Sequence, residues 1–493
     1  MRMSSVAAVI AWNESTNLAQ TMDSVRQCDA VRATLAVVPP GVIAPSDGAV
    51  LSVQSLWSKQ ALLDMLQWFG RGGADHLLLI GSGAPVVTTD GLRRMLCCMA
   101  DMQPSIVYGD YYDMHEDGSV RLHPLIDWQV GSVRDTFDFG PAFLVNGGLL
   151  NEIRTAVAEE TPDVAFGGLY ELRLRLTERA VACHLPEPLY RRPADNPGAQ
   201  AGSHFAYVDP RNRDYQVEME TIATAHLRRI GACIDPPAEK PLDNSGTFPV
   251  TASVVIPVRN RVHTVGDAVK SALSQETGFP FNVIVVDNHS TDGTTELLAD
   301  IARKDSRLTH LIPSRTDLLI GGCWNEAVYS SACGLYAVQL DSDDLYSATD
   351  VLERIVGMLS ENGCALVIGS YTTVDFDLKP LPPGLIDHRE WTDANGHNNA
   401  LRIAGLGAPR AYHVPTLRRF GFPNVSYGED YAAVLRLCRS YPLGRIYDSL
   451  YWCRRWEGNS DSSLPLETAN RYDVFKDRLR TVEIAARIRR EEC

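Results

Sequence analysis

The sequence predicts an α/β protein with two tandem domains, each built on a mixed, mostly parallel sheet flanked by helices. Short apolar strands alternate with segments of helical spacing along the second half of the chain, and this alternation is typical of such sheets. A proline-rich segment lies near the middle of the chain. Segments of the first half also reappear in the second half in the same order, as a duplication predicts.

Three apolar runs of the second half are expected to be strands, at residues 253–256, 283–286 and 336–340. Helical spacing covers residues 262–274, and a second helix is expected over 294–303. Polar clusters follow two of the strands, at Asp287 to Gly293 and at Asp341 to Asp344. Because ligands of such sheets bind at the carboxyl ends of the strands, we expect the functional site at these clusters.

The proline-rich segment marks the expected domain boundary. It carries four prolines between Ile234 and Pro249, and proline resists both helix and sheet because it lacks a backbone N–H and has a fixed φ. We therefore expect a first domain at 1–235, a linker at 236–249, a second domain at 250–465 and a C-terminal helix at 466–493.

Three pairs of segments carry the duplication, each pair separated by about 260 residues. They are Leu79–Gly83 with Gln339–Asp343, Gly168–Leu176 with Glu429–Leu437, and Leu189–Arg192 with Leu450–Arg455. The acidic residues differ between the copies, since Gly81, Gly83 and Leu169 stand where the second half has Asp341, Asp343 and Asp430. The first domain is therefore expected to be a degenerate, non-catalytic copy. Two alternatives stay open, an unrelated fold with accidental matches and a metal-independent site that uses Asp110 or Asp113.

Composition limits the class of protein. The net charge of −15 argues against unspecific nucleic-acid binding, which needs clustered Lys and Arg. The 11 cysteines are odd in number and irregularly spaced, which favours reduced thiols in a cytoplasmic protein over a disulfide framework. We expect no membrane segment and no signal peptide, because no apolar run has the required length.

The segment Asp341-Ser342-Asp343 is a candidate metal site. Alternate residues of a strand point to the same side, so two carboxylates at this spacing can face one point. Hard cations such as Mn²⁺ and Mg²⁺ bind through carboxylates and substrate phosphates. A solvated acidic turn that caps the next helix would show the same pattern.

Four segments of the second half, in this order over about 200 residues, resemble family 2 glycosyltransferases. They are Val254–Asn260, Val285–Gly293, Leu340–Asp344 and Gly428–Tyr431. The resemblance implies the GT-A fold, which is Rossmann-like, and an inverting, non-processive transfer of sugar. It implies a nucleotide-diphosphate sugar as donor, a glycan or lipid-linked acceptor, and Mn²⁺ or Mg²⁺ as cofactor.

The resemblance also implies roles for individual residues. The nucleotide-sugar site would comprise Pro257, Arg259, Asn260, Asp287, Asn288, Asn325, Asp341, Ser342, Asp343 and Arg455. Asp343 would be the principal metal ligand, and Asp341 would approach the metal or the ribose. Asp430 would be the catalytic base, with Glu429, Gly407 and Trp456 on the acceptor side. Acids at this position would also simply favour the start of a helix.

Some family features are absent from the sequence. The pair Trp324-Asn325 replaces the Arg-Asn that often precedes the acidic cluster. No histidine occurs between Tyr447 and Ser463 to serve as a late metal ligand, and Trp452 replaces the glutamine of processive synthases.

Two competing functions stay open at this stage. A nucleotidyltransferase would bring a glycine-rich, lysine-containing phosphate loop, which neither Val6–Gln20 nor Val254–Thr264 shows. A two-domain binding or scaffold protein is the other, although the acids of the second half argue against it. The sequence does not specify the sugar, the base or the acceptor, and a homo-oligomer is left open.

Overall fold

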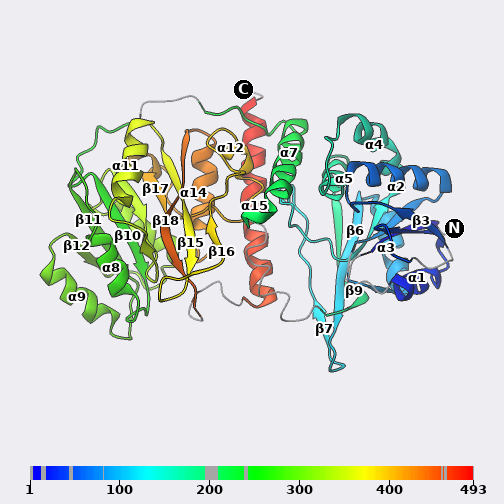
Figure 1. Ribbon diagram of the computed structural model, residues 1–493, viewed down its shortest axis with the longest axis horizontal. Helices are drawn as coiled ribbons and strands as arrows, with labels where there is room; N and C mark the ends of the chain where they lie inside the picture. The colour runs from blue at the N-terminus through cyan, green and yellow to red at the C-terminus, as the bar shows by residue number, and fades with distance from the viewer. Residues whose placement is uncertain are drawn as a thin grey trace. The chain divides into compact units, whose positions relative to one another are not determined.

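The computed structural model of the chain describes residues 4–12, 18–43, 48–81, 83–194, 209–237, 242–456, 459 and 464–491. The chain divides into two compact units, each with its own sheet (Figure 1). The first unit comprises Met1–His204, Asp214–Gly231 and Pro465–Asp477, and the second comprises Phe205–Arg213, Ala232–Leu464 and Arg478–Cys493. Residues 238–241 of the expected linker lie outside the described residues.

The first unit has a nine-stranded mixed sheet in the order β3-β2-β1-β4-β8-β6-β9-β5, with β7 paired to β6. Strands β3, β2, β1 and β4 are parallel, and β8 runs antiparallel between β4 and β6. The strands are β1 Val6–Ala11, β2 Val31–Val38, β3 Ala49–Ser52, β4 His76–Ile80, β5 Val86–Val87, β6 Ile106–Met114, β7 Val120–His123, β8 Ala142–Asn146 and β9 Ala182–Pro193. The helices are α1 Leu18–Arg26, α2 Lys59–Gly72, α3 Thr89–Met102, α4 Gly147–Glu160, α5 Gly168–Thr177 and α7 Arg213–Arg229.

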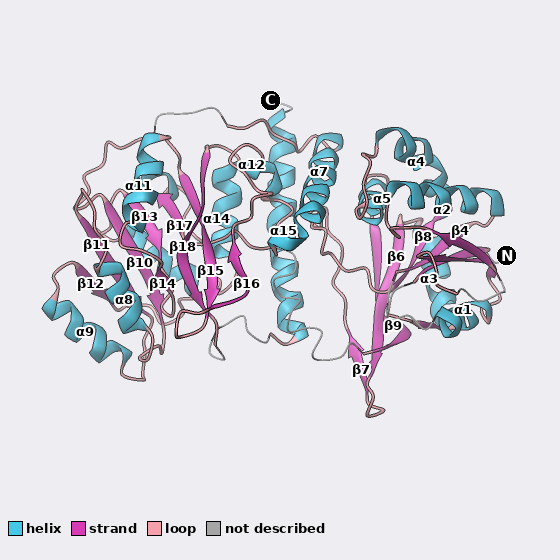
Figure 2. Cartoon of the chain, viewed as in Figure 1, coloured by secondary structure: helices cyan, strands magenta, loops and turns pink. Residues whose placement is uncertain are grey.

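The second unit has the same architecture, with the strand order β12-β11-β10-β13-β17-β15-β18-β14 and β16 paired to β15. The strands are β10 Ala252–Val258, β11 Phe281–Asp287, β12 Leu308–Leu311, β13 Tyr336–Gln339, β14 Leu345–Tyr346, β15 Leu366–Val374, β16 Pro380–Ile386, β17 Arg410–His413 and β18 Leu443–Arg454. The helices are α8 Val265–Leu273, α9 Thr294–Lys304, α10 Ile320–Tyr329, α11 Val351–Glu361, α12 Gly396–Asn399, α13 Val414–Leu417 and α14 Glu429–Cys438. The last helix, α15 Leu466–Glu491, belongs to the first unit up to Asp477 and to the second unit from Arg478. Figure 2 shows the helices along the strands of each sheet.

The two sheets correspond strand for strand. Each strand of the first unit, from β1 to β9, has a counterpart at the same place in the second sheet, and the antiparallel strand falls at the same position in both. The predicted fold class, two tandem α/β domains with mixed sheets, is confirmed. A shared strand order is also what a duplication predicts, and an accidental match of sequence segments would not produce it.

The pairing register places Gly81 at the position of Asp341. Val9 on β1 pairs with Leu79, and Val255 on β10 pairs with Gln339. Gly81 and Asp341 each lie two residues beyond these partners. The following loop is one residue longer in the first unit, because Val87 and Tyr346 are equivalent by their pairing with β9 and β18. The counterpart of Asp343 is therefore Gly83 or Ala84, and neither residue carries a carboxylate.

The apolar runs form strands that are buried on both faces. On β1, Ala8 and Ile10 pack with helices α1 and α3, whereas Ala7 and Val9 pack with α2 and α4. Successive side chains of a strand point to opposite faces, so a strand covered on both sides must be apolar throughout. The same reason explains the run Val283 to Val286 on β11, where all four residues have no exposed surface.

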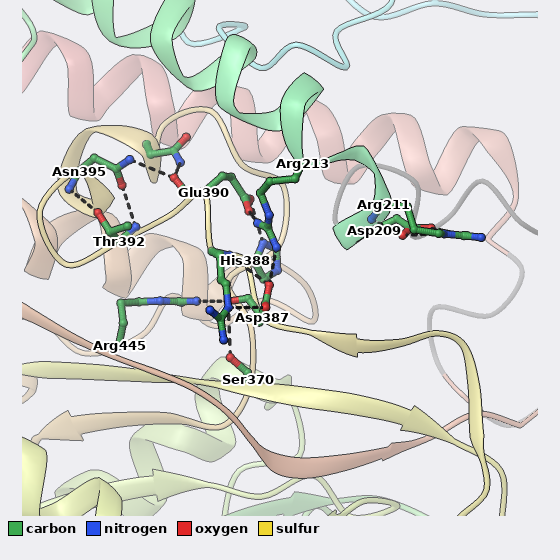
Figure 3. Close-up of polar contacts among 12 residues, drawn as sticks. Asp209, Arg211, Arg213, Ser370, Asp387, His388, Glu390, Thr392, Asn395 and Arg445 are labelled. Carbon is green, nitrogen blue, oxygen red and sulfur yellow. Dashed lines mark hydrogen bonds and ion pairs between the residues drawn. The ribbon is translucent and has the colours of Figure 1, made fainter.

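A polar cluster of the second unit holds Arg213, which belongs to this unit. Figure 3 shows Arg213 directed toward Asp387 and Glu390, which follow β16. Its Nη2 lies 2.6 Å from Asp387 Oδ1 and its Nη1 2.5 Å from Glu390 Oε2. Arg445 Nη2 also donates to the carbonyl of Asp387, at 2.7 Å. Because both carboxylates are buried, they need these partners to remain charged.

Candidate active site

The candidate site lies at the carboxyl ends of three neighbouring parallel strands, β11, β10 and β13. The polar loop after β11 begins at Asn288, and the acidic segment begins one residue after Leu340, which follows β13. The sheet thus brings together two clusters that are far apart in the sequence. The carboxyl edge of such a sheet is where ligands bind.

Three carboxylates crowd together after β13. Asp344 is 5% exposed, and burial together with the charges of Asp341 and Asp343 raises its pKa well above the usual range. Burial also raises the pKa of Asp341, and Asp343 adds to this effect. Like charges this close disfavour ionisation of one another. The charge of Arg410 and the hydrogen bond from Gln339 oppose the increase at Asp341.

The carboxylate of Asp343 is held on one side only. Trp456 Nε1 donates to its Oδ2 at 3.1 Å, and Asn459 Nδ2 donates to the same oxygen at 3.2 Å. Within the described ranges no residue donates a hydrogen bond to Oδ1. The guanidinium of Arg454 donates to the backbone carbonyl of Asp343, and that of Arg261 lies 5.8 Å from the centre of the Trp456 ring.

These residues fit a hard divalent cation. The donors are carboxylate oxygens, which Mn²⁺ and Mg²⁺ prefer, and a cation would relieve the repulsion that raises the pKa values of Asp341 and Asp344. Trp456 and Asn459 donate to Asp343 Oδ2 and fix the orientation of this carboxylate. Metal-binding carboxylates are commonly held by such hydrogen bonds. No group of three or more His, Cys, Asp or Glu side chains suited to a metal occurs in the described part of the chain, so the remaining ligands would come from the substrate or water.

Asp430 and Glu429 open helix α14, whose first turn faces the acidic cluster through Arg410. Gly428 precedes the helix with φ = +85°, a conformation that glycine adopts without strain. Asp430 Oδ2 lies 3.1 Å from Arg410 Nη2, and 24% of its side chain is exposed. Glu429 is more deeply buried. Burial, together with the charges of Asp430 and Asp341, raises its pKa to about 8.

Two buried polar side chains, those of Asp287 and Asn288, lie at the carboxyl end of β11. Asp287 has no exposed surface, and its carboxylate accepts hydrogen bonds from the Ser290 N–H at 3.0 Å and from Thr295 Oγ1 at 2.5 Å. Burial raises its pKa, but these bonds and His310 outweigh it, so the pKa is lowered. The neighbouring Asn288 is 8% exposed, and no described residue bonds its Oδ1.

Three other residues expected in the nucleotide-sugar site, Asn260, Arg259 and Asn325, lie in different environments. Asn260 has φ = +53° and accepts the Thr291 N–H at 2.8 Å, so it fixes the loop after β10 to the loop after β11. Arg259 is exposed beside it. Asn325 is not brought into the cluster, because its amide exchanges two hydrogen bonds with the backbone of Phe422, at 2.8 and 2.9 Å.

The remaining predicted residues lie around the acidic segment. Ser342 is 9% exposed between the two acids, and Pro257 is partly buried near the end of β10. Gly407 has φ = +85°, and an added Cβ would lie 2.8 Å from a backbone carbonyl. Trp456, expected on the acceptor side, donates to Asp343. The backbone N–H of Arg455 donates to the Val374 carbonyl at 2.8 Å, while its neighbour Arg454 reaches the acidic segment.

The comparison with known families decides the class of this domain. Residues 253–412 match the model of glycosyl transferase family 2. These residues form a family 2 glycosyltransferase domain. The match includes Asp341 and Asp343 and ends before helix α14, so the assignment of Asp430 rests on the sequence motif and on the geometry.

Relatives of the transferase domain are found in bacteria. An uncharacterized glycosyltransferase of Rickettsia conorii is 32% identical over 224 residues, which are 45% of this chain and 35% of that protein. TuaG of Bacillus subtilis, named as a putative teichuronic acid biosynthesis glycosyltransferase, is 32% identical over 129 residues, 26% of this chain and 50% of that protein. The chain thus spans about a third of the Rickettsia relative and half of TuaG.

A solved structure of S. aureus TarS, residues 1–349 with UDP-GlcNAc, aligns with a TM-score of 0.37 and 19% identity, over 48% of this chain and 72% of that one. Over the described ranges, no helix combines the length and the apolar composition needed to cross a bilayer.

Several residues around the transferase site were not found from the sequence. They are Arg261, Gln339, Arg410, Tyr451, Arg454 and Asn459, which contact the acidic segment, Trp456 or Asp430. Arg410 begins a strand, and Tyr451 and Arg454 lie on another, so all three reach the site only because β17 and β18 join the same sheet as β13.

The first unit lacks the acids of the transferase site. Gly81 replaces Asp341, and Leu169, the second residue of α5, stands where α14 has Asp430. Asp110 and Asp113, the acids of the alternative site, are both paired. Asp110 lies 2.9 Å from His184 Nε2, and Asp113 contacts His123 at 2.7 Å and Arg192 at 2.8 Å.

Proposed function

We propose that the chain is an inverting, metal-dependent and non-processive glycosyltransferase, with its reaction in the second unit. The observation that carries the proposal is that the fold connects Asp430 on α14 to the acidic segment Asp341 to Asp344. Arg410 contacts Asp430 directly and the Asp341 carboxylate through Gln339, and the first unit has lost the acids of both clusters. The same topology without these acids indicates that the fold does not need them.

In this reaction Asp430 is the general base. Its carboxylate takes the proton of the acceptor hydroxyl as that oxygen forms a bond to the anomeric carbon of the donor sugar. The bond between the anomeric carbon and the diphosphate oxygen breaks on the opposite side, and the electron pair leaves with the nucleoside diphosphate. Partial exposure of Asp430 allows an acceptor to approach it, and general-base catalysis requires such direct contact.

Asp343, with Asp341, would hold the divalent cation. When bound, the cation would act as a Lewis acid that neutralises the charge of the diphosphate. Trp456 and Asn459 keep the Asp343 carboxylate in place. Arg261, which lies over the Trp456 ring, would add a positive charge near the diphosphate.

The nucleotide would lie over Pro257, Asp287 and Asn288. The carboxylate of Asp287 is held by Ser290, Thr295 and His310, so we assign it to holding the pocket. Asn288 Oδ1 is the buried acceptor that no described residue bonds, and leaving it unpaired costs about 1–3 kcal/mol. An N–H group of the base would satisfy it.

The first unit is proposed to be a non-catalytic, transferase-like domain. Its counterpart site has neither a carboxylate for a cation nor a base, and its own acids are occupied by His184, His123 and Arg192. We place its contribution in acceptor binding or in assembly. A scaffold role for the whole chain is disfavoured by the acids that the second unit keeps.

We propose that the acceptor is a glycan or a lipid-linked glycan of a polysaccharide pathway, by analogy with the name of TuaG. A cytoplasmic location agrees with the ten cysteines of the described ranges, all of which are free. The donor would be drawn from the nucleotide-diphosphate sugars of that compartment.

The test is sugar transfer from a panel of nucleotide-diphosphate sugars with Mn²⁺ present. Asp430→Asn is expected to lower turnover by about 10²–10⁴-fold, as loss of a general base does, with donor affinity largely kept. Asp343→Asn and excess EDTA should each remove activity. Asp377→Asn is the matched control, because Asp377 is exposed on the β15–β16 hairpin. Normal turnover by Asp430→Asn, or full activity in EDTA, contradicts the proposed base or the proposed metal.

A further inference from the structure

An exposed aromatic side chain, that of Phe376, lies beside the acidic segment of the transferase site. Phe376 is in the turn that joins β15 and β16 (Figure 1), and it is 48% exposed. Its ring is nearly perpendicular to the Trp456 ring, with 5.7 Å between the ring centres. Trp456 in turn donates to Asp343 Oδ2. One residue thus connects Phe376 to the carboxylate that we assign to the cation.

The guanidinium of Arg454 holds the ring of Phe376 in position. Its Cζ lies 4.9 Å from the centre of that ring, a distance typical of a cation–π contact. Arg454 is only 2% exposed, and its side chain also donates to the Asp343 carbonyl and contacts Asp267 Oδ2 at 3.1 Å. Phe376 is therefore held by residues of the site itself, while nearly half of its surface stays open to a ligand.

The first unit shows that this turn does not require an aromatic residue. The equivalent turn joins β6 and β7 at residues 115–119 and has the same length as the turn at 375–379. In both turns the first residue donates to the carbonyl of the fifth, and the fourth donates to the carbonyl of the first, at 2.9 Å in the first unit and at 3.0 and 3.1 Å in the second. The second position is Glu116 in one turn and Phe376 in the other.

The aromatic residue is absent from the unit that has lost the reacting acids. The pairing of β6 with β9, and of β15 with β18, sets Pro193 at the position of Arg454. The first unit therefore lacks both the ring of Phe376 and the guanidinium that holds it. A single exposed apolar residue needs no explanation by itself. One that is present with the acids of the site and absent without them points to the substrate.

The sheet order places Phe376 on the same side of the acidic segment as the base. The strands β10 and β11, over which the nucleotide would lie, are on one side of β13, and β17, β15 and β18 are on the other. Phe376 follows β15, and Asp430 contacts Arg410 at the start of β17. In an inverting transfer the acceptor oxygen attacks opposite to the bond that breaks, and the base must contact the acceptor. The acceptor therefore approaches from the side of Phe376.

We propose that the exposed surface of Phe376 is a stacking site for a pyranose ring of the acceptor, and that it selects a glycan as the substrate. The proposal rests on the proposed function. The C–H groups on one face of a pyranose are apolar and carry a small positive charge, whereas the face of an aromatic ring is negative. A pyranose can therefore lie flat on Phe376 and keep its hydroxyl groups, one of which reacts, at its rim.

The experiment uses the donor that the transfer screen selects, with Mn²⁺ and with the methyl glycosides of glucose, galactose, mannose and N-acetylglucosamine as acceptors. Release of the nucleoside diphosphate is measured with each glycoside and, as hydrolysis of the donor, without one. The variants are Phe376→Ala, Phe376→Leu, which keeps an apolar side chain without an aromatic face, and Phe376→Tyr, which keeps that face. Leu385→Ala is the control, because Leu385 is exposed on β16 of the same hairpin.

The expected effect is confined to the acceptor. Phe376→Ala and Phe376→Leu should lower kcat/KM for the glycosides by about 5–100-fold, as loss of one stacked aromatic ring does for nucleic-acid bases. Phe376→Tyr and Leu385→Ala should stay close to the wild type. Hydrolysis of the donor and the KM for the donor should be unchanged in all four variants, because neither depends on the acceptor ring.

An unchanged kcat/KM for the glycosides in Phe376→Ala would overturn the proposal. Full activity of Phe376→Leu would also overturn it, since the ring would then only cover Arg454. An equal loss of donor hydrolysis would indicate a structural role, and a raised donor KM would make Phe376 a donor contact. A wild type that hydrolyses the donor but accepts none of the glycosides contradicts the proposal as well. Failure of the proposed function is distinguishable, because Asp430→Asn would then transfer sugar like the wild type.

Discussion

The exchange Glu390→Gln is expected to destabilise the second unit by about 3 kcal/mol at neutral pH. The Glu390 carboxylate lies 2.5 Å from Arg213 Nη1 and 3.4 Å from His388 Nδ1 (Figure 3), and 1% of its side chain is exposed. Burial opposes its ionisation. The hydrogen bond with His388, together with the nearby charge of Arg402, outweighs burial and lowers the pKa of Glu390 from 4.5 to about 2.

The magnitude follows from the two pKa values. The difference between 4.5 and about 2, at about 1.4 kcal/mol for each pH unit, corresponds to about 3 kcal/mol. Removal of one partner from a buried ion pair costs about 3–5 kcal/mol, so the two estimates agree. Because the folded pKa lies below the unfolded one, the stabilisation is present above pH 4.5 and is lost as the pH falls toward 2. At about pH 3.5, about 2 kcal/mol should remain.

The assay is hydrogen exchange in increasing urea, followed in peptides from residues 387–402, because a two-unit chain need not unfold in one step. The difference in unfolding free energy between wild type and Glu390→Gln should be about 3 kcal/mol at neutral pH and smaller at about pH 3.5. Asp393→Asn, an exposed acid of the same loop, is the matched control and should change stability by less than about 0.5 kcal/mol. If the change in unfolding free energy caused by Glu390→Gln equals that of the control, or does not depend on pH, then the ionised Glu390 carboxylate does not stabilise the second unit.

Two further predictions follow from close contacts. An alanine at Gly321 on α10 would place its Cβ 1.9 Å from a backbone carbonyl and 2.9 Å from Glu429 Cβ, so Gly321→Ala should displace α14 and lower kcat by at least about tenfold. Gly357→Ala on α11, where the Cβ meets open space, should leave kcat unchanged and Tm equal or higher. The sulfurs of Cys98 and Cys183 lie 3.2 Å apart, so an added disulfide reagent should join these two cysteines. Mass spectrometry of the digested protein would detect the linked peptides, and their absence would contradict the contact.

The fold was predictable from local patterns. Runs such as Val283 to Val286 are apolar because their strand is covered on both faces, and alternation with helical spacing then leaves few architectures. The matching segments predicted the tandem organisation because each pair lies on equivalent elements: Leu79–Gly83 and Gln339–Asp343 at the ends of β4 and β13, and Gly168–Leu176 and Glu429–Leu437 on α5 and α14. Neither the cysteine pattern nor the expected domain boundaries were needed to predict the fold class.

The site was predictable only where its residues follow the central strands. Asp341 and Asp343 closely follow β13, so the sequence alone indicated them. Arg454 was not predicted, although its guanidinium donates to the Asp343 carbonyl. Successive residues of a strand point to opposite faces, so a motif that selects Arg455 says nothing about its neighbour. Asn325 lies on helix α10. Both polar atoms of its side-chain amide are hydrogen-bonded to the backbone of Phe422. No local sequence pattern indicates a partner so distant in the chain.

Arg410 shows a different limit of sequence reasoning. Its partner Gln339 lies 71 residues away and Asp430 is also distant in sequence, and they meet it because β17 inserts antiparallel between β13 and β15. A strand order is not readable from one sequence. Its counterpart in the first unit is Phe143, which pairs with Leu79 as Arg410 lies opposite Gln339, and this becomes visible only after the register of both sheets has aligned the two copies.

Sugar transfer is proposed to belong to the second unit alone. The most direct measurement is transfer by the full chain carrying both Asp343→Asn and Asp430→Asn, with and without Mn²⁺, after confirming by circular dichroism that the variant is folded. We expect no transfer to any acceptor under either condition, while the wild type is active with Mn²⁺. Residual metal-independent transfer by the double variant, lost when Asp110 or Asp113 is replaced by asparagine, would show that the first unit is an enzyme.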